Sequence, residues 1–150
     1  MIRLVYVSTC ADNVQPADID ALLKSAELRN QQRQISGMLC WSGEFFLQCL
    51  EGERAAVTQC FSRIATDPRH HSVELILSAP TSARWFSQWG MGYSGTMLSH
   101  RVDLPECTGK SFNPYLLEAT DLESTFERLS QLAQRIQGGD DGNPAGHAVG

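Results

Sequence analysis

Hydrophobic residues dominate two runs that flank a short polar connection near the start of the chain. The runs are residues 35–41 and 45–50, and Ser42, Gly43 and Glu44 join them. A glycine in so short a connection allows the positive φ that a tight reversal needs. The pattern therefore predicts a β-hairpin. Successive side chains of a strand point to opposite faces, and in both strands both faces are mainly apolar. We therefore expect both faces of this hairpin to be covered.

Two polar side chains stand out against this pattern. Gln48 lies between large hydrophobic residues in the second strand, where unpaired amide groups cost about 1–3 kcal/mol, so it needs a partner. That partner is either another group of an ordinary core or an amide or ring carbonyl of a ligand. Asn30 stands in residues 29–34, a segment without apolar residues that we interpret as a solvated connection. It is either a helix C-terminal cap or a ligand contact.

The remaining periodicity predicts three further strands and three helices. The strands are expected where apolar and polar residues alternate, over residues 2–8, 72–78 and 84–93. The helices are expected where apolar residues recur at helical spacing, from Asp18 to about Asn30, over residues 53–66, and from Asp121 as N-cap to about Ile136. Residues 94–112 show no regular pattern, and residues 114–117 suggest a short turn.

This order predicts an α+β fold, a ferredoxin-like βαββαββ arrangement with a five-stranded mixed sheet. Two helices would cover one face of the sheet, and the C-terminal helical segment would cover the other. We expect a core at residues 1–93 and a helical extension at residues 94–137 that packs on the sheet. Residues 138–150 lack apolar content and are expected to be disordered.

Composition and charge narrow the function. The chain has 150 residues with 42% hydrophobic content, and its net charge is -5 without a basic run, which argues against nucleic acid and acidic membranes as partners. Its five cysteines have no CxxC spacing, so we expect reduced thiols. No stretch approaches the roughly 18 apolar residues of a membrane span, and the N-terminus does not resemble a signal peptide. We therefore expect a cytoplasmic protein.

Patterns of catalytic and metal-binding residues are missing from this sequence. His70 and His71 lack a Cys, Asp or Glu partner at metal-ligand spacing, and neither a G-x-S-x-G motif nor a phosphate-binding glycine loop occurs. Adjacent histidines after a proline are usually surface residues, and we expect this for His71. Glu51 and Glu53, at the end of a strand, are interpreted as solvated charges. We expect neither a metal site nor enzymatic activity.

Five motifs follow one another in the predicted elements: LVYVS, ISGMLCW five residues after Asn30, GEFFLQCLEGE, DPRHHSVELI and RWFSQWGM. Together they make residues 2–93 resemble the BLUF family of flavin-binding blue-light sensors, in its short stand-alone type. The most specific part is FLQ-x-LEGE with DPRHH downstream. The sequence departs from the family where Arg29 replaces a common asparagine and Ser36 replaces a common threonine.

The resemblance implies roles for individual residues. Tyr6 matches the photoactive tyrosine, Gln48 the glutamine between that tyrosine and the flavin, and Asn30 the asparagine that bonds the ring edge. Trp89 and Met91 match the switch positions on the fifth strand, although a plain core role is the alternative for Trp89.

The resemblance also implies a cofactor. Arg69 and His70 fall where the family has residues near the flavin. A flat apolar ring needs aliphatic walls, which we expect from Ile19, Leu22 or Leu23. The expected flavin is FAD, with FMN or riboflavin as alternatives because no dinucleotide-type glycine motif occurs.

The function that the resemblance implies is that of a blue-light photoreceptor. Light excites the oxidised flavin, an electron and then a proton move from Tyr6 toward it, and Gln48 is left rotated or tautomerised with a stronger hydrogen bond to the ring. We expect a homo-oligomer that signals by contact with a separate protein, with light altering how residues 94–137 pack; alternatively, the last helix only completes the core. The alternative function is a light-independent ferredoxin-like ligand-binding regulator or small enzyme.

Overall fold

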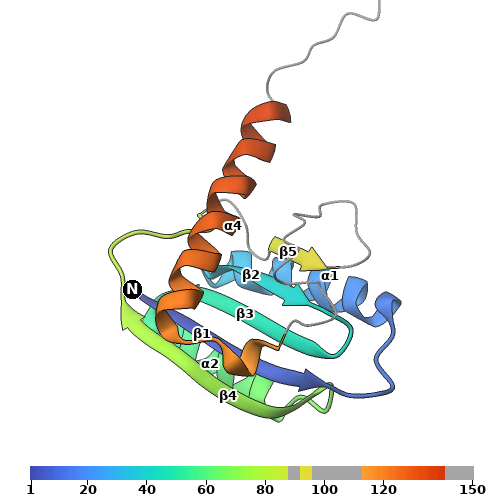
Figure 1. Ribbon diagram of the computed structural model, residues 1–150. Helices are drawn as coiled ribbons and strands as arrows, with labels where there is room; N and C mark the ends of the chain where they lie inside the picture. The colour runs from blue at the N-terminus through green and yellow to red at the C-terminus, as the bar shows by residue number, and fades with distance from the viewer. Residues whose placement is uncertain (88–91, 96–112, 141–150) are drawn as a thin grey trace, which may run out of the picture.

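The computed structural model describes residues 1–87, 92–95 and 113–140, and shows a β-sheet with helices on both of its faces (Figure 1). In chain order the elements are β1 (Ile2–Cys10), α1 (Pro16–Gln32), β2 (Ser36–Trp41), β3 (Phe45–Gly52), α2 (Arg54–Thr66), β4 (His70–Pro80), β5 (Gly92–Gly95), the 3₁₀ turn η1 (Pro114–Leu116) and α4 (Ala119–Asp140). The predicted α+β class is confirmed. None of the helices in this part of the chain is long and apolar enough to cross a membrane.

The strands lie in the order β4-β1-β3-β2-β5. β1 pairs antiparallel with β3 and with β4, β2 pairs antiparallel with β3, and β5 runs parallel to β2. The predicted hairpin is therefore confirmed as β2–β3. Gly43 in its turn has a φ of 93°, a left-handed conformation that glycine adopts without steric cost.

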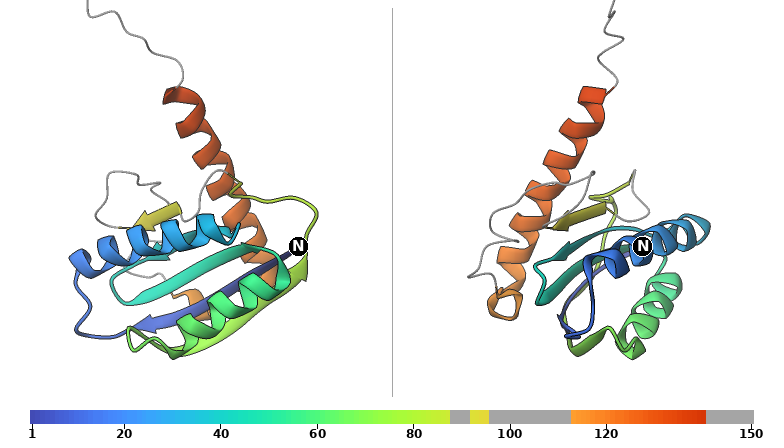
Figure 2. Two further views of the ribbon diagram at one scale, coloured as in Figure 1. Left: turned by 180° about the vertical axis from the view of Figure 1, so that it is seen from behind. Right: turned by 90° about the vertical axis from the view of Figure 1, so that its right-hand side faces the viewer.

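Alternation along the strands divides the core into two halves. On the face covered by α1 and α2, the buried strand residues include Leu4, Tyr6, Leu39, Phe46 and Leu50, and they pack with Ile19 and Val57. On the opposite face Val5, Val7, Met38, Cys40, Leu47 and Cys49 pack with Leu122, Phe126 and Leu129 of α4. Figure 2 shows the sheet between these two layers of helices. Both faces of the hairpin are covered, as expected, and the last helix lies on the face that α1 and α2 leave open.

Two predictions about Glu51 and its surroundings are wrong. Glu51 is fully buried rather than solvated, whereas Glu53 is exposed. The carboxylate of Glu51 accepts hydrogen bonds from the backbone N–H groups of Trp85 and Phe86, at 2.8 and 3.0 Å. Because these N–H groups bond to a side chain instead of a neighbouring strand, residues 84–87 are not the start of a strand. The fifth strand is Gly92–Gly95, so it overlaps the predicted strand only at residues 92–93 and continues into the segment where we expected irregular structure.

The helix ends also differ from the prediction. α1 continues to Gln32, so residues 29–32 are helical and not a solvated connection. Asp121 is not the N-cap of α4, since it lies in the first turn and its carboxylate accepts from the N–H of Glu118 at 3.2 Å. α4 extends to Asp140, past the expected start of a disordered tail at residue 138. Residues 141–150, Trp89 and Met91 lie outside the described residues.

Candidate functional site

A cavity of about 550 Å³ lies between α1, α2 and the sheet. This volume is in the range of about 300–1,000 Å³ that is usual for small-molecule and cofactor sites. The lining residues come from both helices, from β1, β2 and β3, and from the start of β4: Tyr6, Leu22, Ala26, Arg29, Asn30, Leu39, Gln48, Cys60, Arg63, Ile64, Asp67, Pro68, Arg69 and His70. The structure thus brings together five of the predicted site residues, namely Tyr6, Asn30, Gln48, Arg69 and His70.

Tyr6 and Gln48 form a hydrogen-bonded pair in the wall of the cavity. They are direct partners in the β1–β3 ladder, and the Tyr6 hydroxyl donates to Oε1 of Gln48. Tyr6 is fully buried, and burial raises the pKa of its phenol well above the ordinary value. Tyr6 is therefore protonated at neutral pH and acts as a donor. Because Oε1 of Gln48 accepts this bond, the NH₂ end of the amide is the donor toward any further partner.

Asn30 reaches the cavity from the last turn of α1. Its side chain is buried, 4% exposed, in a helix whose only other fully buried residue is Ile19 among those described. The helix C-cap is Arg33, so the interpretation of Asn30 as the cap is wrong. The backbone carbonyl of Asn30 nevertheless helps to end the helix, since it accepts from the N–H of Arg33 at 3.1 Å and of Ile35 at 2.8 Å. Its amide and that of Gln48 line the same cavity.

His70 lines the cavity at the start of β4, whereas His71 is exposed, as expected. Nδ1 of His70 lies 2.7 Å from Oγ of buried Ser8, and the ring packs on Phe46 with a centroid separation of 4.4 Å. Burial lowers the pKa of His70 from 6.5 to about 4, a shift that Asp67 opposes and Arg69 adds to. His70 is therefore neutral at physiological pH.

Charged side chains gather at one side of the cavity. Asp67 binds Arg69 through both carboxylate oxygens, with Nε of Arg69 at 3.0 and 3.1 Å, and these hydrogen bonds lower the pKa of Asp67. Cys60 is partly buried there, and burial raises the pKa of its thiol although nearby arginines, with Arg63 the strongest, oppose the shift. Within residues 1–87, 92–95 and 113–140, no three His, Cys, Asp or Glu side chains are arranged to hold a metal ion.

The aliphatic walls differ from those expected. Leu22 of α1 lines the cavity, but Ile19 and Leu23 do not; both belong to the core around it. The opposite wall includes Ile64 of α2, which sequence reasoning did not select. The sequence does place Ile64 in the apolar stripe of the second helix, which predicts a buried side chain. Only the packing of the two helices shows that this stripe ends at a cavity.

An isoalloxazine ring fits this arrangement of residues. The ring is flat and apolar, with acceptors and a donor along one edge. Leu22 on α1 and Ile64 on α2 supply aliphatic walls, and Asn30 and Gln48 supply amides that can both donate to and accept from the edge of such a ring. Arg69 and His70 are further polar residues of the lining.

Comparison with known proteins gives one consistent result. A family model described as "BLUF: Sensors of blue-light using FAD" matches residues 1–92. The chain is 30% identical over 134 residues to the blue light- and temperature-regulated antirepressor BluF of Escherichia coli (strain K12), which covers 89% of this chain and 33% of that protein. It is 36% identical over 90 residues to the photoactivated adenylate cyclase subunit beta of Euglena gracilis, covering 59% of this chain and 10% of that protein.

Solved structures give the same match. The ground state of BlsA aligns with a TM-score of 0.75 at 27% identity, over 86% of this chain and 87% of that one. The dark state of BlrB, a BLUF protein, aligns with a TM-score of 0.63 at 27% identity, over 92% and 96% of the two chains. The alignments cover most of these two structures, whereas the chain spans only about a third of the antirepressor and a tenth of the cyclase subunit.

Proposed function

Because the chain belongs to the BLUF family of blue-light sensors that use FAD, we propose that it is a blue-light photoreceptor whose signal starts at the Tyr6–Gln48 pair. The observation that carries this proposal is the hydrogen bond from the buried Tyr6 hydroxyl to Gln48 in the wall of a cavity that suits a flavin. When bound, a flavin would supply absorption of blue light and an acceptor for an electron and a proton.

Tyr6 is suited to provide both the electron and the proton. Its hydroxyl is buried and protonated, and its proton is already directed at Gln48, so proton transfer along this bond needs no rearrangement of solvent. Phe61 packs beside the Tyr6 ring with a centroid separation of 5.4 Å. This packing and the bond to Gln48 hold the phenol in one orientation.

Gln48 converts that transfer into a lasting change. An amide that rotates or tautomerises exchanges its donor and acceptor ends, so the same side chain presents a different hydrogen-bonding pattern to Tyr6 and to the ring. Asn30 would hold the ring edge meanwhile, and Arg69 and His70 would lie near the flavin. We infer that FAD occupies the site, with FMN and riboflavin as alternatives. A change of one such bond is worth only about 1 kcal/mol, so the signal needs an element with two arrangements close in energy.

The finer assignments belong to this proposal as well. We infer a ferredoxin-like βαββαββ arrangement, supported by the order β4-β1-β3-β2 within the sheet. We propose a cytoplasmic, non-enzymatic protein that self-associates and signals by contact with a separate protein. This is supported by the relative that is named an antirepressor. Trp89 and Met91 are proposed to take part in the switch.

Absorption spectroscopy tests this function directly. We expect the purified protein to be yellow, with the structured band of a bound flavin, and to show a reversible shift of that band to longer wavelength under blue light. Tyr6→Phe and Gln48→Leu should each keep the flavin and lose the shift, because each removes one end of the buried hydrogen bond. Asn30→Ala should instead weaken flavin binding or alter the dark spectrum.

The outcomes separate this function from its alternative. A colourless protein that takes up no added flavin would point to the light-independent regulator or small enzyme. A Tyr6→Phe variant that shifts and recovers like the parent would contradict the role of Tyr6 while leaving flavin binding intact.

A further inference from the structure

Two polar pairs lie on the same two strands and on opposite faces of the sheet. In the β1–β3 ladder Tyr6 is the direct partner of Gln48, and Arg3 is the direct partner of Glu51. Each member of one pair is thus three residues from a member of the other, roughly 10 Å along a strand. An odd offset reverses the face, so Tyr6 and Gln48 face the cavity whereas Arg3 and Glu51 face the side that carries α4.

Arg3 and Glu51 hold a segment that lies outside the ladder. Nη2 of Arg3 lies 3.2 Å from the Glu51 carboxylate and donates to the carbonyl of Ala83 at 2.9 Å, while Glu51 accepts from the N–H groups of Trp85 and Phe86. Arg84 adds bonds to the carbonyls of Glu51 and Gln34, at 3.1 and 2.6 Å. Residues 83–86 are therefore fixed by Arg3 of β1, by Glu51 of β3 and by Arg84 of the segment itself.

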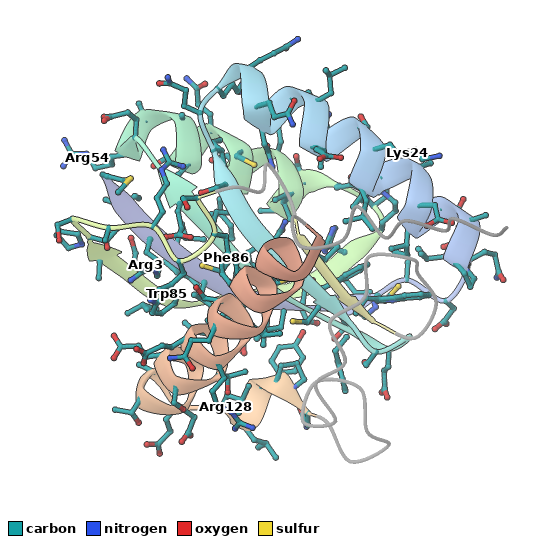
Figure 3. All side chains as sticks on the ribbon, turned by 90° about the horizontal axis from the view of Figure 1, so that it is seen from above. Arg3, Lys24, Arg54, Trp85, Phe86 and Arg128 are labelled. Carbon is teal, nitrogen blue, oxygen red and sulfur yellow. The ribbon has the colours of Figure 1, made fainter. Side chains whose placement is uncertain are left out.

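The same segment contacts α4. The Trp85 ring stacks on Phe126 with an interplanar angle of 14° and a centroid separation of 6.3 Å, and the carbonyl of Trp85 accepts from Oγ of Ser130 at 2.6 Å. The guanidinium carbon of Arg3 also lies 3.4 Å from the centroid of the Trp85 ring. Figure 3 shows Arg3, Trp85 and Phe86 together beside α4. The helices that carry Lys24 and Arg54 lie across the sheet from them.

We propose that Arg3 and Glu51 are positioning residues that couple the Tyr6–Gln48 pair to α4 through Trp85. This inference rests on the proposed function, because it needs light to act at Gln48. A change at Gln48 displaces β3 against β1, the two strands carry Glu51 and Arg3, and these two residues set where Trp85 lies beneath the helix. The buried Nε–H of Arg3 has no hydrogen-bond partner among the described residues. Arg3 therefore has one donor that the arrangement seen here does not use.

Hydrogen exchange of the flavin-loaded full chain, in the dark and under blue light, tests the coupling. In the parent we expect illumination to change exchange in residues 119–131 of α4. Glu51→Gln keeps the size of the side chain and removes its charge, so we expect it to keep the light-induced absorption shift and lose the light-minus-dark difference in α4. Glu53→Gln is the matched control, because it makes the same change two residues away at an exposed position whose side chain does not cap α2.

A second variant keeps the test decisive if Glu51→Gln does not fold. Trp85→Leu retains the ion pair and removes the ring that contacts both Arg3 and Phe126, and the same loss of the α4 difference is expected. The proposal is overturned if folded Glu51→Gln, or Trp85→Leu in its place, keeps the full light-minus-dark difference, even with faster exchange in the dark, which is what a merely structural role predicts. It is also overturned if α4 of the parent does not respond to light. A parent without a flavin band or absorption shift would instead contradict the proposed function.

Discussion

Burial and neighbouring charged side chains determine the protonation state of His70. Its pKa is lowered from 6.5 to about 4, mainly by burial, in contact with Ser8 and Phe46. Between these two pH values the unfolded chain binds a proton at His70 that the native protein does not bind. The free energy of unfolding should therefore fall as the pH is lowered from 6.5 toward 4, and the contribution of His70 should be complete above pH 6.5.

The magnitude of this effect can be measured by difference. We expect His70 to account for a loss on the order of 3 kcal/mol across this pH range in the flavin-free protein. Asp67 and other carboxylates also titrate in acid, so the comparison is between the parent and His70→Asn, which keeps a polar group near Ser8 but does not titrate. Urea unfolding at several pH values should give a flatter curve for the variant. Equal slopes in both proteins would contradict the assignment.

At the scale of single elements, Gly37 determines how closely β2 and β3 approach. A Cβ atom at Gly37 would lie 2.1 Å from the backbone oxygen of Cys49, which is the residue after Gln48. The atom in its way belongs to the backbone, so it cannot be relieved by a side-chain rotation. We expect Gly37→Ala to lower the free energy of unfolding by about 1–3 kcal/mol or more.

If the added methyl group displaces β3 at Cys49, the neighbouring Gln48 should move as well. Gly37→Ala is therefore expected to alter the light-induced absorption shift as well as the urea midpoint. Gly43→Asn is the comparison, because no atom lies within 4 Å of a Cβ at Gly43 and asparagine tolerates positive φ better than most residues. A larger loss of stability in Gly43→Asn than in Gly37→Ala would argue against close strand approach as the cause.

At the scale of the whole molecule, the two halves of the core serve different parts of the proposed function. The cavity lies on the α1 and α2 face, while Phe126 is fully buried on the α4 face against Trp85 and Phe86. Phe126→Ala should lower the free energy of unfolding by about 3–5 kcal/mol, because it leaves a cavity under α4. Flavin affinity in the dark should change by no more than about threefold, since Phe126 does not line the cavity.

Denaturant unfolding and a flavin titration measure these two effects separately. Leu116→Ala is a suitable control, because Leu116 is 78% exposed and surface substitutions usually change stability by no more than about 0.5 kcal/mol. Loss of flavin binding in a folded Phe126→Ala variant would show that the packing of α4 determines flavin affinity.

The sequence by itself determined the alternation of the strands, and with it the two faces of the core. Tyr6, Gln48 and Leu50 were assignable to one face and Leu47 and Cys49 to the other because side-chain direction in a strand follows from local backbone geometry. The need of Gln48 for a partner also followed from local chemistry. The motifs then added the identity of that partner, Tyr6, which periodicity alone does not supply.

Only the tertiary structure decided the environment of Glu51 and the conformation of residues 84–87. Whether a carboxylate at a strand end is solvated or buried depends on donors that come from elsewhere in the chain, here the N–H groups of Trp85 and Phe86 and the guanidinium of Arg3. The same holds for Asn30 and Ile64, whose place at the cavity depends on how α1 and α2 pack on the sheet. Local periodicity fixes which way a side chain points, whereas long-range packing fixes what it meets.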